Sequence, residues 1–171
     1  MIFRFSVRNL LRWVLLLLII AIISIQFYRP NKNDAKVTPS TDFFLSFDAP
    51  ESVKKHVVNA CYDCHSNTTK YTWFDNVMPI GWWVDNTILK GKTSLNFSVW
   101  EQYEGWHKLN LLSAIEFDLK TSKMPPKNYT EYHKSAELSN DQRQEIIDWI
   151  STIDRPSLVI SKTNNYNYAQ D

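Results

Sequence analysis

The chain has 171 residues, of which 44% are hydrophobic and 14% aromatic, and it carries 19 basic and 18 acidic side chains. Four basic residues precede Pro30 and every acidic residue follows it, so the part after Pro30 has 15 basic and 18 acidic residues, a net charge of −3. This balance leaves no basic stripe and excludes nucleic-acid binding. The three glycines and the absence of Asn-Gly or Asp-Gly pairs argue against an all-β fold.

Residues 1–28 predict an N-terminal membrane anchor. Three arginines precede an apolar run from Trp13 to Ile23, and with the residues that follow it the run approaches the roughly 20 residues that cross a bilayer. The basic flank is expected to stay in the cytoplasm, so the rest of the chain would lie on the periplasmic side of the inner membrane. A cleaved signal peptide is the alternative, although no small-x-small cleavage site follows the run. Both alternatives export the rest of the chain.

A polar linker and an amphipathic helix follow the anchor. Residues 29–40 predict a tether without a core of its own. Residues 41–47 predict an extended, phenylalanine-rich lead-in that packs onto the domain. A helix is expected to begin near Asp48, with Pro50 in its first turn. Its apolar positions recur every four residues and lead directly into the one motif that carries chemistry.

That motif is Cys61-Tyr62-Asp63-Cys64-His65, which reads C-x-x-C-H, the attachment signature of a c-type haem. Two thiols at this spacing can each add to one vinyl group of the same porphyrin, and the adjacent imidazole becomes the proximal iron ligand. Cys61 and Cys64 are the only cysteines in the chain. The sequence therefore predicts one covalently attached haem c, held by Cys61 and Cys64 and ligated by His65.

Three other interpretations of the motif are weaker. A thioredoxin-like dithiol would follow a strand in a βαβ pattern, whereas a helix precedes this motif. A structural zinc site would need a fourth ligand, for which His107 or His133 is available. A disulfide between the two cysteines would leave His65 unexplained.

The remaining pattern predicts an all-α, cytochrome c-like haem domain over residues 41–155, with a polar tail over 156–171. The expected helices run from Pro79 to Lys90, ending at Gly91, and from Trp106 to Leu119, with a short element capped by Ser98 between them. A last helix begins at Ser139, where Ser-x-x-Gln forms a capping box. Single tryptophans are expected to be ordinary core residues, although they are also pocket-wall candidates: Trp73, Trp82, Trp83, Trp100 and Trp106.

Met124 is the predicted distal ligand of the iron. It lies 59 residues after His65 in Met-Pro-Pro, where the prolines stiffen the backbone. Met78, also followed by proline, is the next candidate, and a histidine (His107 or His133) or an open sixth position are further alternatives. Alternatively, Met124 binds no iron and only fills a gap in the core.

A longer string of residues resembles the haem-binding-domain family of bacterial envelope proteins over about Asp42 to Ile150. It comprises Cys61–Asn67, Thr69, Trp73-Phe74, Pro79, Trp82, Gly91, Leu95–Ser98, Trp100, Met124-Pro125, Tyr129, His133 and Leu138-Ser139. The resemblance implies a mostly helical domain with a c-type haem, and it supports Met124 as the distal ligand by analogy with cytochromes c.

Together these patterns predict a membrane-anchored electron carrier that exchanges single electrons with redox partner proteins. Tethering such a carrier to the membrane raises its effective concentration near membrane-bound partners. A haem peroxidase or a haem-based gas or redox sensor is the alternative, and either would need an open or exchangeable sixth position on the iron.

Overall fold

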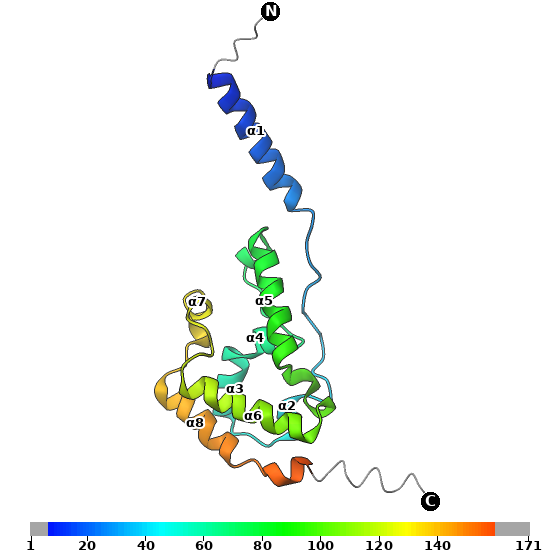
Figure 1. Ribbon diagram of the computed structural model, residues 1–171, viewed down its shortest axis with the longest axis vertical. Helices are drawn as coiled ribbons and strands as arrows, with labels where there is room; N and C mark the ends of the chain where they lie inside the picture. The colour runs from blue at the N-terminus through cyan, green and yellow to red at the C-terminus, as the bar shows by residue number, and fades with distance from the viewer. Residues whose placement is uncertain (1–6, 160–171) are drawn as a thin grey trace, which may run out of the picture. The chain divides into compact units, whose positions relative to one another are not determined.

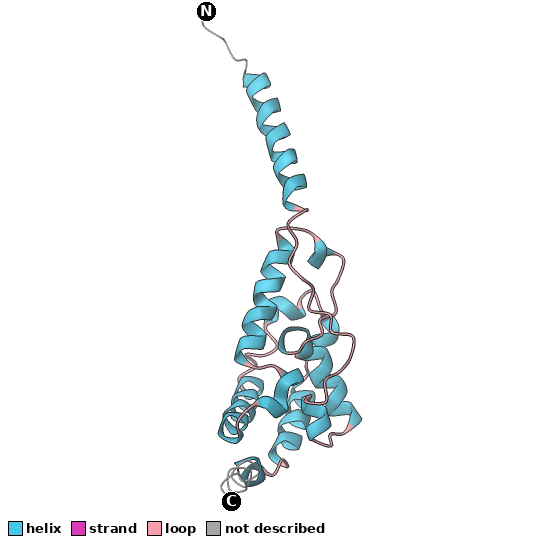
Figure 2. Cartoon of the chain, turned by 90° about the vertical axis from the view of Figure 1, so that its right-hand side faces the viewer, coloured by secondary structure: helices cyan, strands magenta, loops and turns pink. Residues whose placement is uncertain are grey.

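The computed structural model describes residues 7–159, and its regular structure is helical. The longer helices are α1 (Val7–Ile25), α3 (Glu51–Ala60), α5 (Ile80–Ser94), α6 (Gly105–Lys120) and α8 (Asn140–Ser151) (Figure 1). The shorter ones are α2 (Phe43–Ser46), α4 (Tyr62–His65) and α7 (Lys127–Thr130), and the 3₁₀ helices are η1 (Phe74–Asn76), η2 (Phe97–Gln102) and η3 (Lys134–Ala136). Within residues 7–159 there is no strand (Figure 2), and only an isolated bridge joins Asp34 to Thr68. The all-α prediction is confirmed.

The described chain forms two compact units. Residues 7–32 and 71–87 make up the first unit, and residues 33–70 and 88–159 make up the second. The predicted domain limits at residues 28, 40 and 155 stay predictions. Part of the predicted anchor (1–6) and most of the predicted tail (160–171) lie outside the described residues.

Helix α1, in the first unit, is apolar along its whole length. It has 19 residues with a mean hydropathy of 2.1, and its side chains are not buried against the rest of the described chain. Its length and composition fit a membrane span or a signal sequence.

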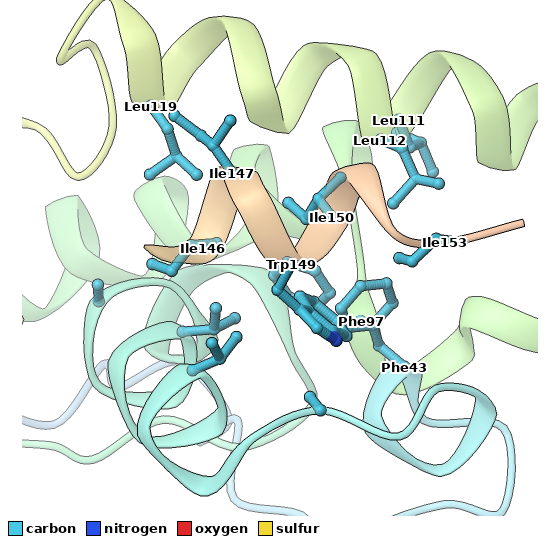
Figure 3. Close-up of a cluster of buried hydrophobic side chains, with 14 of the residues drawn as sticks. Phe43, Phe97, Leu111, Leu112, Leu119, Ile146, Ile147, Trp149, Ile150 and Ile153 are labelled. Carbon is cyan, nitrogen blue, oxygen red and sulfur yellow. The ribbon is translucent and has the colours of Figure 1, made fainter. Parts of the chain in front are cut away.

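The core of the second unit is built around Phe43, whose side chain is 1% exposed. The Phe43 ring meets the ring of Trp100 edge-on at a centroid distance of 4.7 Å and lies 5.1 Å from the ring of Phe97. Aliphatic side chains of α6 and α8, among them Leu112 and Ile150, complete the cluster (Figure 3). The lead-in packs onto the domain, as the sequence predicted, and Phe43 is part of its core.

Local capping explains why the lead-in is helical. Asp42 accepts a hydrogen bond from the Phe44 amide at 3.1 Å and so caps the short helix α2. The prediction of an extended segment was wrong because this cap, together with burial of Phe43, outweighs the weak helix propensity of phenylalanine. The predicted capping box of α8 is confirmed, with Ser139 and Gln142 exchanging hydrogen bonds.

Three other predicted boundaries differ from the structure. Helix α3 begins at Glu51 with Pro50 as its N-cap, rather than at Asp48. The short element after α5 is capped by Asn96, whose side chain accepts from the Ser98 amide at 3.0 Å, rather than by Ser98. Helix α5 continues past Gly91 to Ser94.

The tryptophans divide in a way that the sequence did not predict. Trp100 is fully buried in the core, as expected, whereas Trp73, Trp83 and Trp106 are 80%, 54% and 63% exposed. The expectation that each is an ordinary core residue was wrong for these three.

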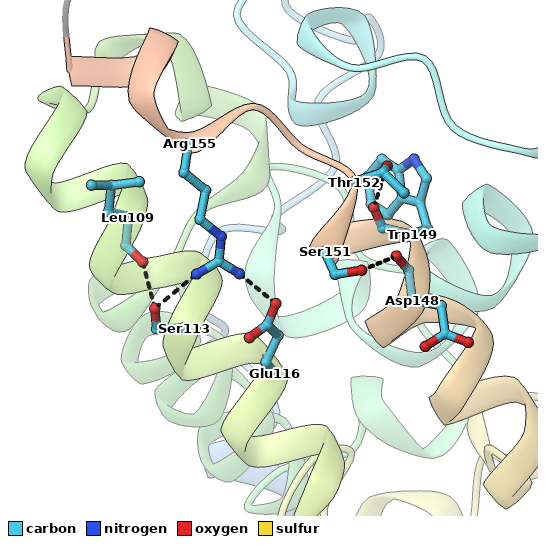
Figure 4. Close-up of polar contacts among 8 residues, drawn as sticks. All are labelled: Leu109, Ser113, Glu116, Asp148, Trp149, Ser151, Thr152 and Arg155. Carbon is cyan, nitrogen blue, oxygen red and sulfur yellow. Dashed lines mark hydrogen bonds and ion pairs between the residues drawn. The ribbon is translucent and has the colours of Figure 1, made fainter.

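The segment that follows α8 is tied to α6. Arg155 donates to Ser113 Oγ over 3.4 Å and forms an ion pair with Glu116, both residues of α6 (Figure 4). These contacts hold the end of the second unit against the helix that precedes the Met124 loop.

Candidate functional site

The C-x-x-C-H motif is a single helical turn at the end of α3. The Cys61 amide donates to the Val57 carbonyl at 2.9 Å, so Cys61 closes α3. Its own carbonyl then accepts from the amides of Cys64 at 3.2 Å and His65 at 2.9 Å. Because one carbonyl accepts both hydrogen bonds, the backbone from Cys61 to His65 forms one compact turn, which carries both thiols and the imidazole.

The imidazole of His65 is held by a backbone carbonyl. Its Nδ1 lies 3.0 Å from the carbonyl oxygen of Leu95. A carbonyl only accepts, so Nδ1 carries the proton and, in the neutral imidazole, Nε2 keeps its lone pair. Burial lowers the pKa of His65, against the opposing effects of the Leu95 and Gly91 carbonyl groups and of Asp118. The ring is therefore neutral near pH 7, in the form that binds metals.

The two cysteines are half-buried thiols without a disulfide. Burial raises the pKa of Cys61 to about 12, with a further rise from the neighbouring Cys64, and burial raises the pKa of Cys64 to about 11. Redox-active dithiols instead have thiol pKa values lowered toward or below neutrality. This electrostatic setting does not support the dithiol alternative.

Zinc has no visible ligand set in the described chain. Among residues 7–159, no group of three or more His, Cys, Asp or Glu side chains is arranged to hold a metal ion. His107 lies against the rings of Tyr103 and Trp106, at centroid distances of 4.8 and 5.5 Å. His133 stacks on Tyr129 at 4.3 Å.

Gly91 is where α5 meets the turn. A Cβ atom at this position would lie 2.4 Å from the carbonyl oxygen of Cys64 and 3.1 Å from its Cβ. The prediction that Gly91 ends the helix was wrong, because the glycine serves this close approach within a continuous α5. The approach also brings Leu95, one helical turn later, to the imidazole of His65.

Asp63, between the two cysteines, anchors the turn to distant segments. Its carboxylate accepts from the Lys70 amide at 2.9 Å and from the Tyr129 hydroxyl at 2.7 Å. Its backbone carbonyl accepts from the Thr69 hydroxyl at 2.6 Å. Nothing in the spacing of the motif singles out Asp63, since the two x positions of C-x-x-C-H are unrestricted, and its partner Tyr129 is 66 residues away.

Tyr62, the other intervening residue, belongs to the core. Its ring stacks on Phe97 at 5.1 Å and on Phe44 at 5.9 Å, with interplanar angles of 9° and 14°. Its hydroxyl donates to Asp42 at 3.0 Å, and burial raises the pKa of that carboxyl. The side of the turn that carries Tyr62 is thus packed, and Asp42 both caps α2 and binds the motif.

Met124 lies in a loop that is fastened on both sides. Its amide donates to the Asp118 carbonyl at 3.3 Å, and its carbonyl accepts from Arg143 of α8 at 2.5 Å. Its side chain is half-buried and the following Pro125 is buried. The loop leads into α7, whose Tyr129 binds Asp63, so the Met-Pro-Pro segment is linked to the C-x-x-C-H turn. Met78 belongs to the first unit, where its side chain is 4% exposed and lies close under Gly81.

Comparison with known proteins identifies the family. The sequence matches the model of the haem-binding domain over residues 20–152, which is most of the chain. The chain belongs to this haem-binding-domain family. A search of curated proteins and a search of solved structures found no match.

The residues of this haem-binding-domain protein fit the cofactor. The match spans the C-x-x-C-H turn, and that turn presents two unpaired thiols and a neutral imidazole whose Nδ1 is already engaged. An imidazole held in this way is the usual arrangement of a metal-binding histidine, because the second hydrogen bond sets both its tautomer and its ring orientation.

Proposed function

We propose that this protein is a membrane-anchored c-type cytochrome that transfers single electrons, with its haem domain on the periplasmic side of the inner membrane. Cys61 and Cys64 would each hold the porphyrin through a thioether, His65 would be the proximal ligand and Met124 the distal one. The bound haem would supply an iron that cycles between its ferric and ferrous states.

The hydrogen bond from His65 Nδ1 to the Leu95 carbonyl is the observation that carries the proposal. It leaves Nε2 as the free lone pair on the same turn as both thiols. Gly91 lies against the Cys64 peptide and the Leu95 carbonyl holds the imidazole, so both the backbone and the ligand histidine of the motif are positioned by the protein itself. A thioether ligand on the other side would favour the reduced iron relative to a second imidazole.

Acid-acetone extraction tests covalent attachment. We expect haem to stay with the denatured, exported protein after extraction, and to be lost to the solvent when both cysteines are replaced by serine. His65→Ala should abolish the native low-spin spectrum, whereas His56→Ala, a control on α3 whose side chain pairs with Glu145 at 3.4 Å, should retain it. Haem that leaves the wild-type protein with the solvent would contradict the proposal.

The distal ligand is tested with Met124→Ala. We expect loss of the methionine-to-iron charge-transfer band of the ferric protein and a fall in reduction potential, because the thioether would be replaced by water or a stronger donor. Met78→Ala is the matched control, since Met78 also precedes a proline, and it should keep the band. A wild-type haem that is high-spin and binds carbon monoxide at once would instead support the sensor or peroxidase alternative.

A further inference from the structure

The first unit exposes an unusual set of apolar side chains in residues 73–83. Trp73 is 80% exposed, Val77 40%, Ile80 43% and Trp83 54%. Ile80 and Trp83 are three residues apart in α5 and therefore lie on the same side of that helix. We call these four residues the apolar surface. Several exposed apolar side chains within one short segment mark an interaction site more often than a single exposed side chain does.

Hydrogen bonds fix this segment at the end of α1. The Gln26 side chain donates to the Met78 carbonyl at 2.9 Å and accepts from the Met78 amide at 3.0 Å. The Trp82 indole donates to the Tyr28 carbonyl at 2.8 Å, and the two rings meet edge-on at 6.1 Å. Gln26 directly follows Ile25, the last residue of α1. The segment is therefore held at the level where α1 ends.

That level is the surface of any membrane that α1 crosses. The 19 residues of α1 span about 29 Å at the helical rise of about 1.5 Å per residue, close to the roughly 30 Å thickness of a hydrocarbon core. A segment bonded to Gln26 and Tyr28, within three residues of the end of the helix, must then lie beside the lipid head groups. Phe27 and Tyr28 also follow the end of α1 and are 86% and 78% exposed.

We propose that the apolar surface, Trp73, Val77, Ile80 and Trp83, inserts into the head-group region of the bilayer that α1 crosses and forms a second membrane contact. The proposal rests on the membrane anchor of the proposed function. Tryptophan suits this layer because its ring is apolar and its N–H is polar. The charges of the unit are compatible with this position: Arg29 and Lys32 are exposed cations, which suit lipid phosphates. Of the two acids in residues 71–87, Asp75 is 7% exposed and accepts from Thr72, and Asp85 is half-buried.

Fluorine NMR of the full-length holoprotein in lipid nanodiscs tests this contact. The seven tryptophans are replaced by 5-fluorotryptophan, and single Trp-to-Phe variants assign the signals. Nanodiscs of neutral lipid are compared without spin label, with a head-group label and with a label at the chain end. We expect the Trp73 and Trp83 signals to lose most of their intensity with the head-group label and much less with the chain-end label.

Two other tryptophans serve as controls. Trp100 is buried in the second unit, so it should keep its signal. Trp73 and Trp83 signals that broaden no more than the Trp100 signal, or that respond only to a second protein copy in the disc, would overturn the proposal. Trp13 of α1 reports the anchor separately. A broadened Trp13 signal with unaffected Trp73 and Trp83 signals refutes the second contact alone, whereas an unaffected Trp13 signal refutes the anchor.

Discussion

At the scale of single residues, the position of the C-x-x-C-H turn depends on residues other than its cysteines and histidine. Gly91 touches the carbonyl of Cys64, and Asp63 binds a tyrosine on another helix. Neither residue bears on iron chemistry directly, yet each determines where the C-x-x-C-H turn lies.

Gly91→Ala should displace the turn. The added Cβ would lie 2.4 Å from the Cys64 carbonyl oxygen, and backbone cannot yield as a side chain does. We expect a loss of about 3 kcal/mol or more in the free energy of unfolding, and reduced haem content in the exported protein. The measurements are chemical denaturation and haem absorbance per mole of protein. Lys90→Ala, at the exposed neighbouring position, is the control, and equal effects of the two variants would contradict the role of Gly91.

Tyr129→Phe should change how stability depends on pH. Burial, and then the hydrogen bond to Asp63, raise the pKa of Tyr129 above its ordinary value. Above about pH 10 the unfolded chain releases the phenol proton while the folded chain keeps it, so stability falls as pH rises. We expect the variant to lose about 1–3 kcal/mol at neutral pH and to show a shallower decline between about pH 9 and about pH 11.

Guanidinium denaturation of the holoprotein at a series of pH values measures this slope. Tyr132→Phe is the control, because Tyr132 lies three residues further along the chain and is 72% exposed. A decline in Tyr129→Phe as steep as in the wild type would show that the phenol contributes nothing to the pH dependence.

At the scale of elements, α6 and α8 determine where the Met124 loop lies. The loop follows α6, and Arg143 of α8 holds the Met124 carbonyl. The helical periodicity of α6 and the capping box of α8 could be predicted because both are local patterns in the chain. The caps of α2 and η2 are local as well, but the sequence does not show that Asp42 and Asn96 also bind the distant residues Tyr62 and Asn67.

Leu112→Ala should weaken the packing of α6 in the core cluster. The Leu112 side chain is 0% exposed, and its loss leaves a cavity, so we expect a loss of about 2–5 kcal/mol in the free energy of unfolding. Leu89→Ala, whose side chain is 57% exposed, should cost far less. Thermal unfolding followed by circular dichroism compares the two variants, and similar costs would argue against α6 as a core helix.

At the scale of the whole molecule, α1 decides whether the haem domain is tethered. The prediction is that the mature protein keeps residues 1–28 and stays in the membrane pellet after carbonate washing. Leu16→Arg should shift part of the protein to the soluble fraction, because a central arginine costs about 2.5–3.5 kcal/mol of insertion free energy. Leu16→Ile is the control. An intact mass that lacks the N-terminal residues would identify α1 as a cleaved signal sequence instead.

The helical class, the haem motif and the apolar N-terminus could be read from the chain because each is a contiguous pattern. Two thiols and an imidazole within five residues predict a haem site without any knowledge of the fold. The carbonyl that orients His65, the tyrosine that binds Asp63 and the exposure of Trp73 and Trp83 became visible only once the chain was folded. These depend on which distant segments meet, and that is set by burial of the whole core rather than by any local run of residues.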